Sequence, residues 1–76
     1  MTHVEIEYCV PCGHLDRAVD TQRHLLELLG RNVETVALRP GDGGVFEVRV
    51  DGETVFDKDD EAYDLDSIAE RVSERA

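Results

Sequence analysis

Two cysteines separated by two residues are the feature of this chain best suited to chemistry. Cys9-Val10-Pro11-Cys12 contains the only cysteines among the 76 residues, and random placement would rarely give this spacing. Cysteines so spaced can close a disulfide with each other, and Pro11 stiffens the loop because its ring fixes φ. A disulfide across so short a loop gains little chain entropy, which makes a purely structural role the weaker interpretation. The pattern therefore favours reversible thiol–disulfide chemistry at Cys9 and Cys12.

The sequence leaves other interpretations of the cysteine pair open. The pair could hold a soft metal ion or serve as a protein-interaction module, or the two cysteines could simply pack together. A tetrahedral zinc site needs four ligands, and of the three histidines only His14 is within easy reach of the motif. His3 lies at the far end of the preceding segment and His24 well along the following one. A solvent-facing place at a helix start is the simpler interpretation of His14, and we expect no bound metal.

The cysteine motif stands between a predicted strand and a predicted helix. Residues Val4–Tyr8 alternate apolar and acidic, as a strand with one buried face does. Apolar residues recur at helical spacing over Leu15–Leu29, with Asp16 in the first turn and Gly30 as a candidate cap. The partial positive charge of a helix start stabilises a nearby thiolate, which is the reactive form of cysteine. The junction is therefore the predicted active site.

The remaining sequence predicts three further strands and one further helix. Turn-forming residues Pro40–Gly44 interrupt regular structure, and Asp51-Gly52 is a favoured two-residue hairpin turn. Asp64 is a candidate N-cap for the second helix, with Arg71 and Arg75 near its end. The predicted strands are Val33–Leu38, Val45–Val50 and Glu53–Phe56, a charged connection spans Asp57–Tyr63, and the helix runs from Leu65 to Val72.

The order strand, helix, strand, strand, strand, helix predicts one α/β domain over residues 1–76. The first helix with its two flanking strands forms a parallel crossover unit, expected to be right-handed. The hairpin adds antiparallel strands, so the predicted sheet is mixed and four-stranded, with helices over its apolar faces. Cys9 and Cys12 then lie at the carboxyl edge of the first strand, where open α/β sheets place their sites.

A second motif is more specific than the cysteine pair. Gly44-Val45-Phe46-Glu47-Val48 is followed by Val50-Asp51-Gly52 and by Val55-Phe56-Asp57-Lys58. Together with the cysteine motif, these runs make nearly the whole chain similar to the Rdx family, the selenoprotein W-like branch of thioredoxin-like proteins, related to selenoproteins T and H. The resemblance implies a thioredoxin-like βαβββα fold and a redox role that needs no cofactor.

The resemblance also suggests roles for individual residues. Selenoprotein members carry selenocysteine at the position matched by Cys12, with Cys9 as its partner, whereas thioredoxin-like geometry favours Cys9 as the attacking thiol. Pro40 is too far upstream of Phe46 to match the cis-proline of thioredoxins. Pro11, His14 and Phe46 are expected to support the site, although core packing also explains Phe46. The implied partners are protein disulfides, low-molecular-weight thiols and a thioredoxin system.

The charge balance disfavours several classes of partner. Eighteen Asp and Glu outnumber seven Arg and the single lysine, Lys58, for a formal net charge of −10. Nucleic acid and anionic membrane are therefore unfavourable partners. Acidic residues occur along the whole chain, a composition similar to that of cytoplasmic proteins of salt-accumulating halophiles. We therefore expect a haloarchaeal member of the family. The sequence has no basic, apolar leader and no membrane-length apolar segment, so we expect a soluble cytoplasmic protein.

The charge balance leads to a prediction about salt. Self-repulsion at low ionic strength opposes folding, and molar salt shortens the screening length to about 3 Å. The thermal midpoint should therefore rise steadily from low to molar KCl, and acidification to about pH 5 should act partly in the same direction by neutralising carboxylates. Circular dichroism melts across a KCl series measure the effect. A midpoint independent of KCl would show that the carboxylates are too widely spaced to repel.

Overall fold

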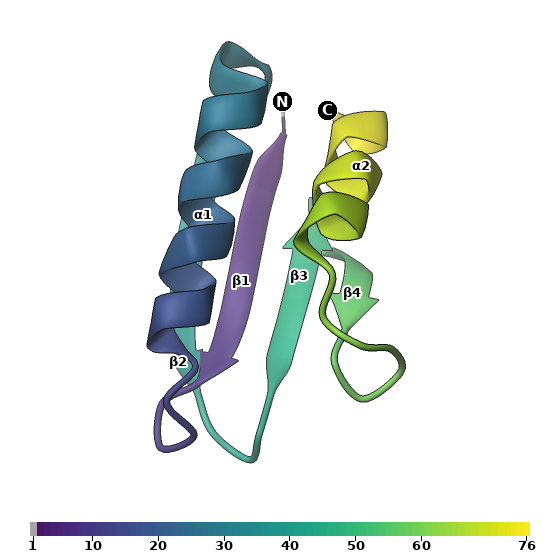
Figure 1. The fold of residues 1–76 in the computed structure, drawn as a ribbon. Coiled ribbons are helices and arrows are strands. Elements are labelled where there is room, and N and C mark those ends of the chain that lie inside the picture. The colour runs from purple at the N-terminus through teal and green to yellow at the C-terminus, as the bar shows by residue number, and fades with distance from the viewer. Residues whose placement is uncertain (1) are drawn as a thin grey trace.

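The computed structural model describes residues 2–76 and has the element order βαβββα. In Figure 1 the chain forms a sheet with two α-helices packed against it. Neither helix within residues 2–76 is long and apolar enough to cross a membrane. The elements are β1 (His3–Cys9), α1 (Leu15–Leu29), a short 3₁₀ turn η1 (Gly30–Asn32), β2 (Thr35–Gly41), β3 (Phe46–Val50), β4 (Glu53–Asp57) and α2 (Leu65–Arg75).

The sheet is mixed and four-stranded, with the strand order β2-β1-β3-β4. The central strand β1 pairs in parallel with β2 and antiparallel with β3, and β4 completes the hairpin. This is the predicted arrangement, in which a parallel crossover is extended by a hairpin. Because β1 is bonded on both sides, the cysteine at its last residue starts from a fixed position.

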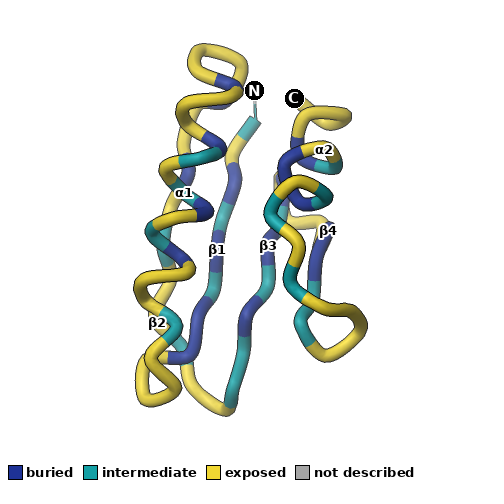
Figure 2. The backbone as a smooth tube through the Cα atoms, viewed as in Figure 1, coloured by how far each residue is buried: buried dark blue, intermediate teal, exposed yellow. Residues whose placement is uncertain are grey.

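Both helices lie against the same face of the sheet (Figure 1). α1 packs on β1 and β2, and α2 packs on β3 and β4. Their inner surfaces and the facing strands are buried, while their outer surfaces are exposed (Figure 2). Apolar burial between helix and sheet is the main stabilising term for such a layered domain. The largest fully buried side chains in this layer are Phe46, Ile6, Leu25, Ile68, Val4, Val48 and Val72.

The second strand differs from its prediction. The sequence predicts a strand over Val33–Leu38, but β2 runs from Thr35 to Gly41. It therefore includes Pro40 and Gly41, which the sequence places in a turn. Pro40 pairs with Tyr8, and Gly41 with Cys9, in the parallel register. Because β2 is an edge strand, a proline without an N–H is tolerated there, and pairing with β1 extends the strand past its apolar run.

Aspartate and glycine residues end or cap the other elements at the predicted positions. Asp51 and Gly52 have φ values of 51° and 87°, and the two positive φ angles match a type I′ hairpin turn. The carboxylate of Asp64 accepts a 3.2 Å hydrogen bond from the backbone N–H of Ser67 and caps α2. Gly30 has a φ of 51° and its N–H donates to the carbonyl of Leu26, which ends α1.

On the sheet face without helices, one arginine bridges three glutamates. Arg49 donates hydrogen bonds of 2.7, 2.7 and 2.9 Å to the carboxylates of Glu5, Glu7 and Glu47. Glu7 and Glu47 are directly opposite each other on β1 and β3, so without the guanidinium their like charges would repel. The pKa of Arg49 is raised, chiefly by its hydrogen bond to Glu7. In this cluster the single guanidinium thus offsets part of the charge of the three carboxylates at the centre of the open face.

Replacing Arg49 tests the cluster. Arg49→Gln removes the cation and leaves three facing carboxylates, so the free energy of unfolding should fall by about 1–3 kcal/mol at low salt. The matched control is Arg39→Gln. Within residues 2–76 the one ion pair of Arg39 is with Glu5, at 3.7 Å, so this variant should change the free energy of unfolding by less than about 1 kcal/mol. Urea denaturation in low and molar KCl compares them. Equal losses in the two variants would mean that the cluster adds nothing to stability.

Candidate functional site

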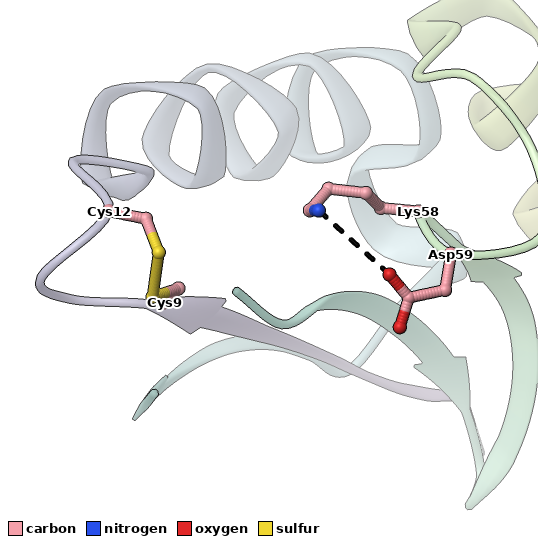
Figure 3. Close-up of a disulfide and its surroundings, with 4 residues drawn as sticks. All are labelled: Cys9, Cys12, Lys58 and Asp59. Carbon is pink, nitrogen blue, oxygen red and sulfur yellow. Dashed lines mark ion pairs between the residues drawn. A yellow bond between two sulfur atoms is a disulfide. The ribbon is translucent and has the colours of Figure 1, made fainter. Parts of the chain in front are cut away.

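Cys9 and Cys12 form a disulfide at the carboxyl end of β1 (Figure 3). Their Cα atoms are 5.3 Å apart, within the usual range for disulfide-bonded cysteines. Cys9 is the last residue of the strand, and Cys12 lies in the loop that leads to α1. The structure therefore unites the two residues that the sequence singled out, at the edge of the sheet where they were expected.

Backbone hydrogen bonds anchor the disulfide loop to both strands beside β1. The N–H of Cys9 donates to the carbonyl of Val45 at 2.8 Å, before β3, and the N–H of Val10 donates to the carbonyl of Gly41 at 3.0 Å, at the end of β2. Gly13, with a φ of 76°, turns the chain back, and its N–H donates to the carbonyl of Val10. The first half of the motif is thereby fixed to the sheet, while the second half projects from it.

The two cysteines differ sharply in burial. Cys9 is 0% exposed, whereas Cys12 and Pro11 are exposed. Val10, between them, is 54% exposed although apolar. A reagent approaching from solvent therefore meets Cys12 first. Thiol–disulfide exchange depends on access to the sulfur, so this asymmetry makes the two cysteines differ in their accessibility to attack.

The helix starts at the predicted residue, but both cysteines lie outside its first turn. α1 begins at Leu15, and His14 is its N-cap residue without a side-chain capping hydrogen bond. Cys12 therefore precedes the cap by two residues. Because the influence of a helix terminus decays within about one turn, the dipole of α1 acts on the Cys12 sulfur only weakly. Stabilisation of a thiolate there must depend more on nearby side chains.

Phe46 packs in the core as one of its two sequence interpretations predicted, and its role in supporting the site stays a prediction. It is 1% exposed, and its ring meets the rings of Phe56 and Tyr63 edge-on at 6.3 and 5.6 Å. The ring of His14 lies 6.1 Å from it, also edge-on. His14 is therefore partly buried against Phe46 and does not simply face solvent. Tyr8 is buried with the core, as predicted.

The other histidines lie away from the disulfide. His3 begins β1, at the opposite end from Cys9, beside a surface hollow of about 540 Å³ that also involves Asp51 and Gly52. His24 lies in the second half of α1. Within residues 2–76, no group of three or more His, Cys, Asp or Glu side chains is arranged to hold a metal ion. The arrangement gives the metal-binding interpretation no additional ligand.

Two basic residues near the disulfide were not predicted as part of the site. The guanidinium of Arg17, in the first turn of α1, lies 4.6 Å from the centroid of Tyr63 and 6.0 Å from that of Phe46. Lys58 follows β4, and its backbone N–H donates to the carbonyl of Phe46. A sequence signal existed for each: a cation in a first helical turn opposes the helix dipole, and Lys58 is the only lysine.

Comparison with known proteins identifies relatives along the whole domain. The model of the Rdx family matches residues 3–74. A crystal structure of a protein from Bordetella parapertussis is 31% identical, with 99% of this chain and 98% of that chain covered and a TM-score of 0.92. A selenoprotein W-related protein from Vibrio cholerae is 28% identical, with coverage of 97% and 95% and the same TM-score. No curated protein gives a significant match. The βαβββα arrangement is thus that of selenoprotein W-related proteins.

The difference in burial predicts a difference in labelling. In the reduced protein a bulky maleimide should modify Cys12 about 100-fold faster than Cys9, because Cys9 reacts only after local opening. Mass spectrometry of proteolytic fragments over a time course measures both rates. Urea-unfolded protein is the control, in which the two cysteines should react at similar rates. Similar rates in the folded protein would contradict the burial of Cys9.

Proposed function

This chain belongs to the Rdx family, and from that premise we propose that it is a small thiol–disulfide oxidoreductase using Cys9 and Cys12. The observation that carries the proposal is a disulfide with one buried and one exposed cysteine at the carboxyl edge of the sheet. A structural staple would gain little from so short a loop and would need no exposed sulfur. The asymmetry suits a protein that exchanges its disulfide with a partner.

The exposure of Cys12 supports it as the attacking residue. In the reduced protein its thiolate attacks one sulfur of a substrate disulfide, a new sulfur–sulfur bond forms, and the other substrate sulfur leaves as a thiolate. Cys12 matches the position at which the family's selenoproteins carry selenocysteine. We therefore favour Cys12 over Cys9, the attacking residue that thioredoxin-like geometry would favour. A fully buried Cys9 is poorly placed to receive an incoming protein disulfide.

Cys9 resolves the mixed disulfide. Its thiolate attacks the sulfur of Cys12 across the short loop, which releases the second substrate thiolate and leaves Cys9 bonded to Cys12. Two electrons have then passed from the protein dithiol to the substrate, and both substrate sulfurs are protonated from water. Burial protects Cys9 from competing oxidants, so the resolving thiol is kept for this intramolecular step. A cellular thiol then reduces the disulfide.

Single cysteine variants test these roles. With a model protein disulfide, Cys9→Ser should accumulate a mixed disulfide through Cys12, because the resolving thiol is missing. Cys12→Ser should accumulate at least about ten-fold less, since Cys9 is inaccessible. Intact-mass measurement after acid quenching quantifies the adduct, and the double variant gives the background. Accumulation with neither single variant would remove the mechanism.

Native mass spectrometry separates redox chemistry from the metal-binding alternative. Redox chemistry predicts that oxidation lowers the mass by two hydrogens and that reduction restores it, without any metal. Zinc that is retained by the reduced protein and lost after thiol blocking would instead favour a metal-binding module. The second outcome would count against an oxidoreductase even if the disulfide can form.

A further inference from the structure

The disulfide end of this acidic protein carries two cations that have no close carboxylate partner within residues 2–76. The first is Arg17, whose guanidinium packs over the Tyr63 ring at 4.6 Å. Within residues 2–76, Arg17 has no ion pair with a carboxylate. In contrast, Arg49, Arg71 and Arg75 all contact glutamates at 2.9 Å or less. Aromatic packing fixes the Arg17 guanidinium while its N–H groups stay available to a ligand.

The second cation is Lys58, the only lysine of the chain. Figure 3 shows its ammonium group extending from the segment after β4 toward the side on which the disulfide lies. Its contact with Asp59 is long, at 3.9 Å, and the Asp59 side chain is 83% exposed, so this pair is weak. The backbone of Lys58 is bonded to Phe46, the residue over which Arg17 also lies. Phe46 thus places both cations on the same end of the molecule.

The position of Arg17 is unfavourable for folding alone. A positive charge in the first turn of a helix opposes the helix dipole, whereas Asp16 in the same turn complements it. Arg23 and Arg31 likewise have no ion pair within residues 2–76, so Arg17 is distinguished by its fixed place over the rings of Tyr63 and Phe46. Two weakly paired cations near a redox disulfide are instead suited to binding an anion from solution.

We propose that Arg17 and Lys58 bind the carboxylate of a low-molecular-weight thiol that reduces the Cys9–Cys12 disulfide. The inference rests on the proposed redox function, which already calls for a cellular thiol, and adds the charge of that thiol and the residues that recognise it. Arg17 offers a planar donor and Lys58 a point charge, both of which recognise carboxylates. The surface that they form with His14 and Tyr63, over the buried ring of Phe46, is named here the cationic rim.

The charge of the whole domain favours a small anion over an acidic protein. A net charge of −10 repels an extended acidic surface, which meets carboxylates on every side. A small thiol with one or two carboxylates interacts mainly with groups within a Debye length, about 8 Å at physiological ionic strength. It can therefore gain attraction from the cationic rim without meeting most of the repulsion. The cationic rim therefore favours a small molecule as its ligand.

The reaction at the cationic rim is a balanced two-step exchange. A thiolate bound by Arg17 and Lys58 attacks the exposed sulfur of Cys12, which forms a mixed disulfide and releases the Cys9 thiolate to take a proton from water. A second molecule of the same thiol attacks the sulfur of the first, which releases Cys12 as a thiol. The protein gains two electrons and two protons, and the small thiol becomes its own disulfide.

A series of small thiols of different charge tests the proposal. The probes are mercaptopropionate, mercaptoethanol and cysteamine, which are anionic, neutral and cationic. Each second-order rate for reduction of Cys9–Cys12 is divided by the rate of the same thiol with 2,2′-dithiodipyridine, a neutral disulfide, which removes differences in intrinsic reactivity. At low ionic strength mercaptopropionate should exceed mercaptoethanol by about five-fold, and molar KCl should abolish the preference.

Charge-removing variants locate the preference. Arg17→Gln and Lys58→Gln should each reduce the ratio of mercaptopropionate to mercaptoethanol by about two- to three-fold, and together they should bring it near one. Arg31→Gln is the matched control, because Arg31 is also a cation without an ion pair within residues 2–76 but lies beyond the opposite end of α1. It changes the net charge equally and should leave the ratio within about 1.5-fold of the original.

The outcomes separate this inference from the proposed function. Reduction by all three thiols without a preference for the anion, or an equal effect of Arg31→Gln, would overturn the cationic rim but leave the oxidoreductase intact. A disulfide that none of the thiols reduces would overturn the proposed function itself. The thiol series on the unaltered protein keeps the inference falsifiable if a variant fails to fold, which circular dichroism detects.

Discussion

The hydrogen-bonding of β1 on both sides is the constraint on which the site depends. β1 lies between β2 and β3, and its pairing continues to the cysteine motif, where Cys9 bonds to Val45 and Val10 to Gly41. Moving Cys9 would break bonds shared with both neighbouring chain segments, each of which is costly to leave unpaired. Only the residues after Val10 are free to project. One buried and one projecting sulfur follow directly from this arrangement.

The two faces of the sheet deal with charge in different ways. On the open face, Arg49 sits among three glutamates and is saturated by them. On the helix side, near the disulfide, Arg17 packs against aromatic rings and is left without a carboxylate among residues 2–76. Arginine therefore pairs with carboxylates on the open face, whereas near the disulfide it carries a charge that is not paired within residues 2–76. Burial and neighbours, rather than residue identity, decide between the two.

Local patterns predicted much of this fold because they are local in origin. The alternation in β1, the helical period of α1 and the Asp51-Gly52 turn each encode their own geometry. The extension of β2 to Gly41 depends on pairing with β1, which no window of sequence contains. Alternation alone would group Cys9 with Glu5 and Glu7, yet Cys9 is fully buried. The placement of both helices on one face and of cations around Phe46 likewise arises only when distant segments meet.

The complete burial of Cys9 makes the redox reaction part of a thermodynamic cycle with folding. In that cycle, the difference in folding free energy between the oxidised and reduced proteins equals the difference in oxidation free energy between the folded and unfolded proteins. Any core substitution that favours the oxidised packing of Cys9 over the reduced one therefore shifts the reduction potential, by about 30 mV for every 1.4 kcal/mol. Buried residues such as Ile6 and Val48, both 0% exposed, can in this way shift the potential of the disulfide from inside the core. The stability of the core and that of the Cys9–Cys12 bond are therefore linked.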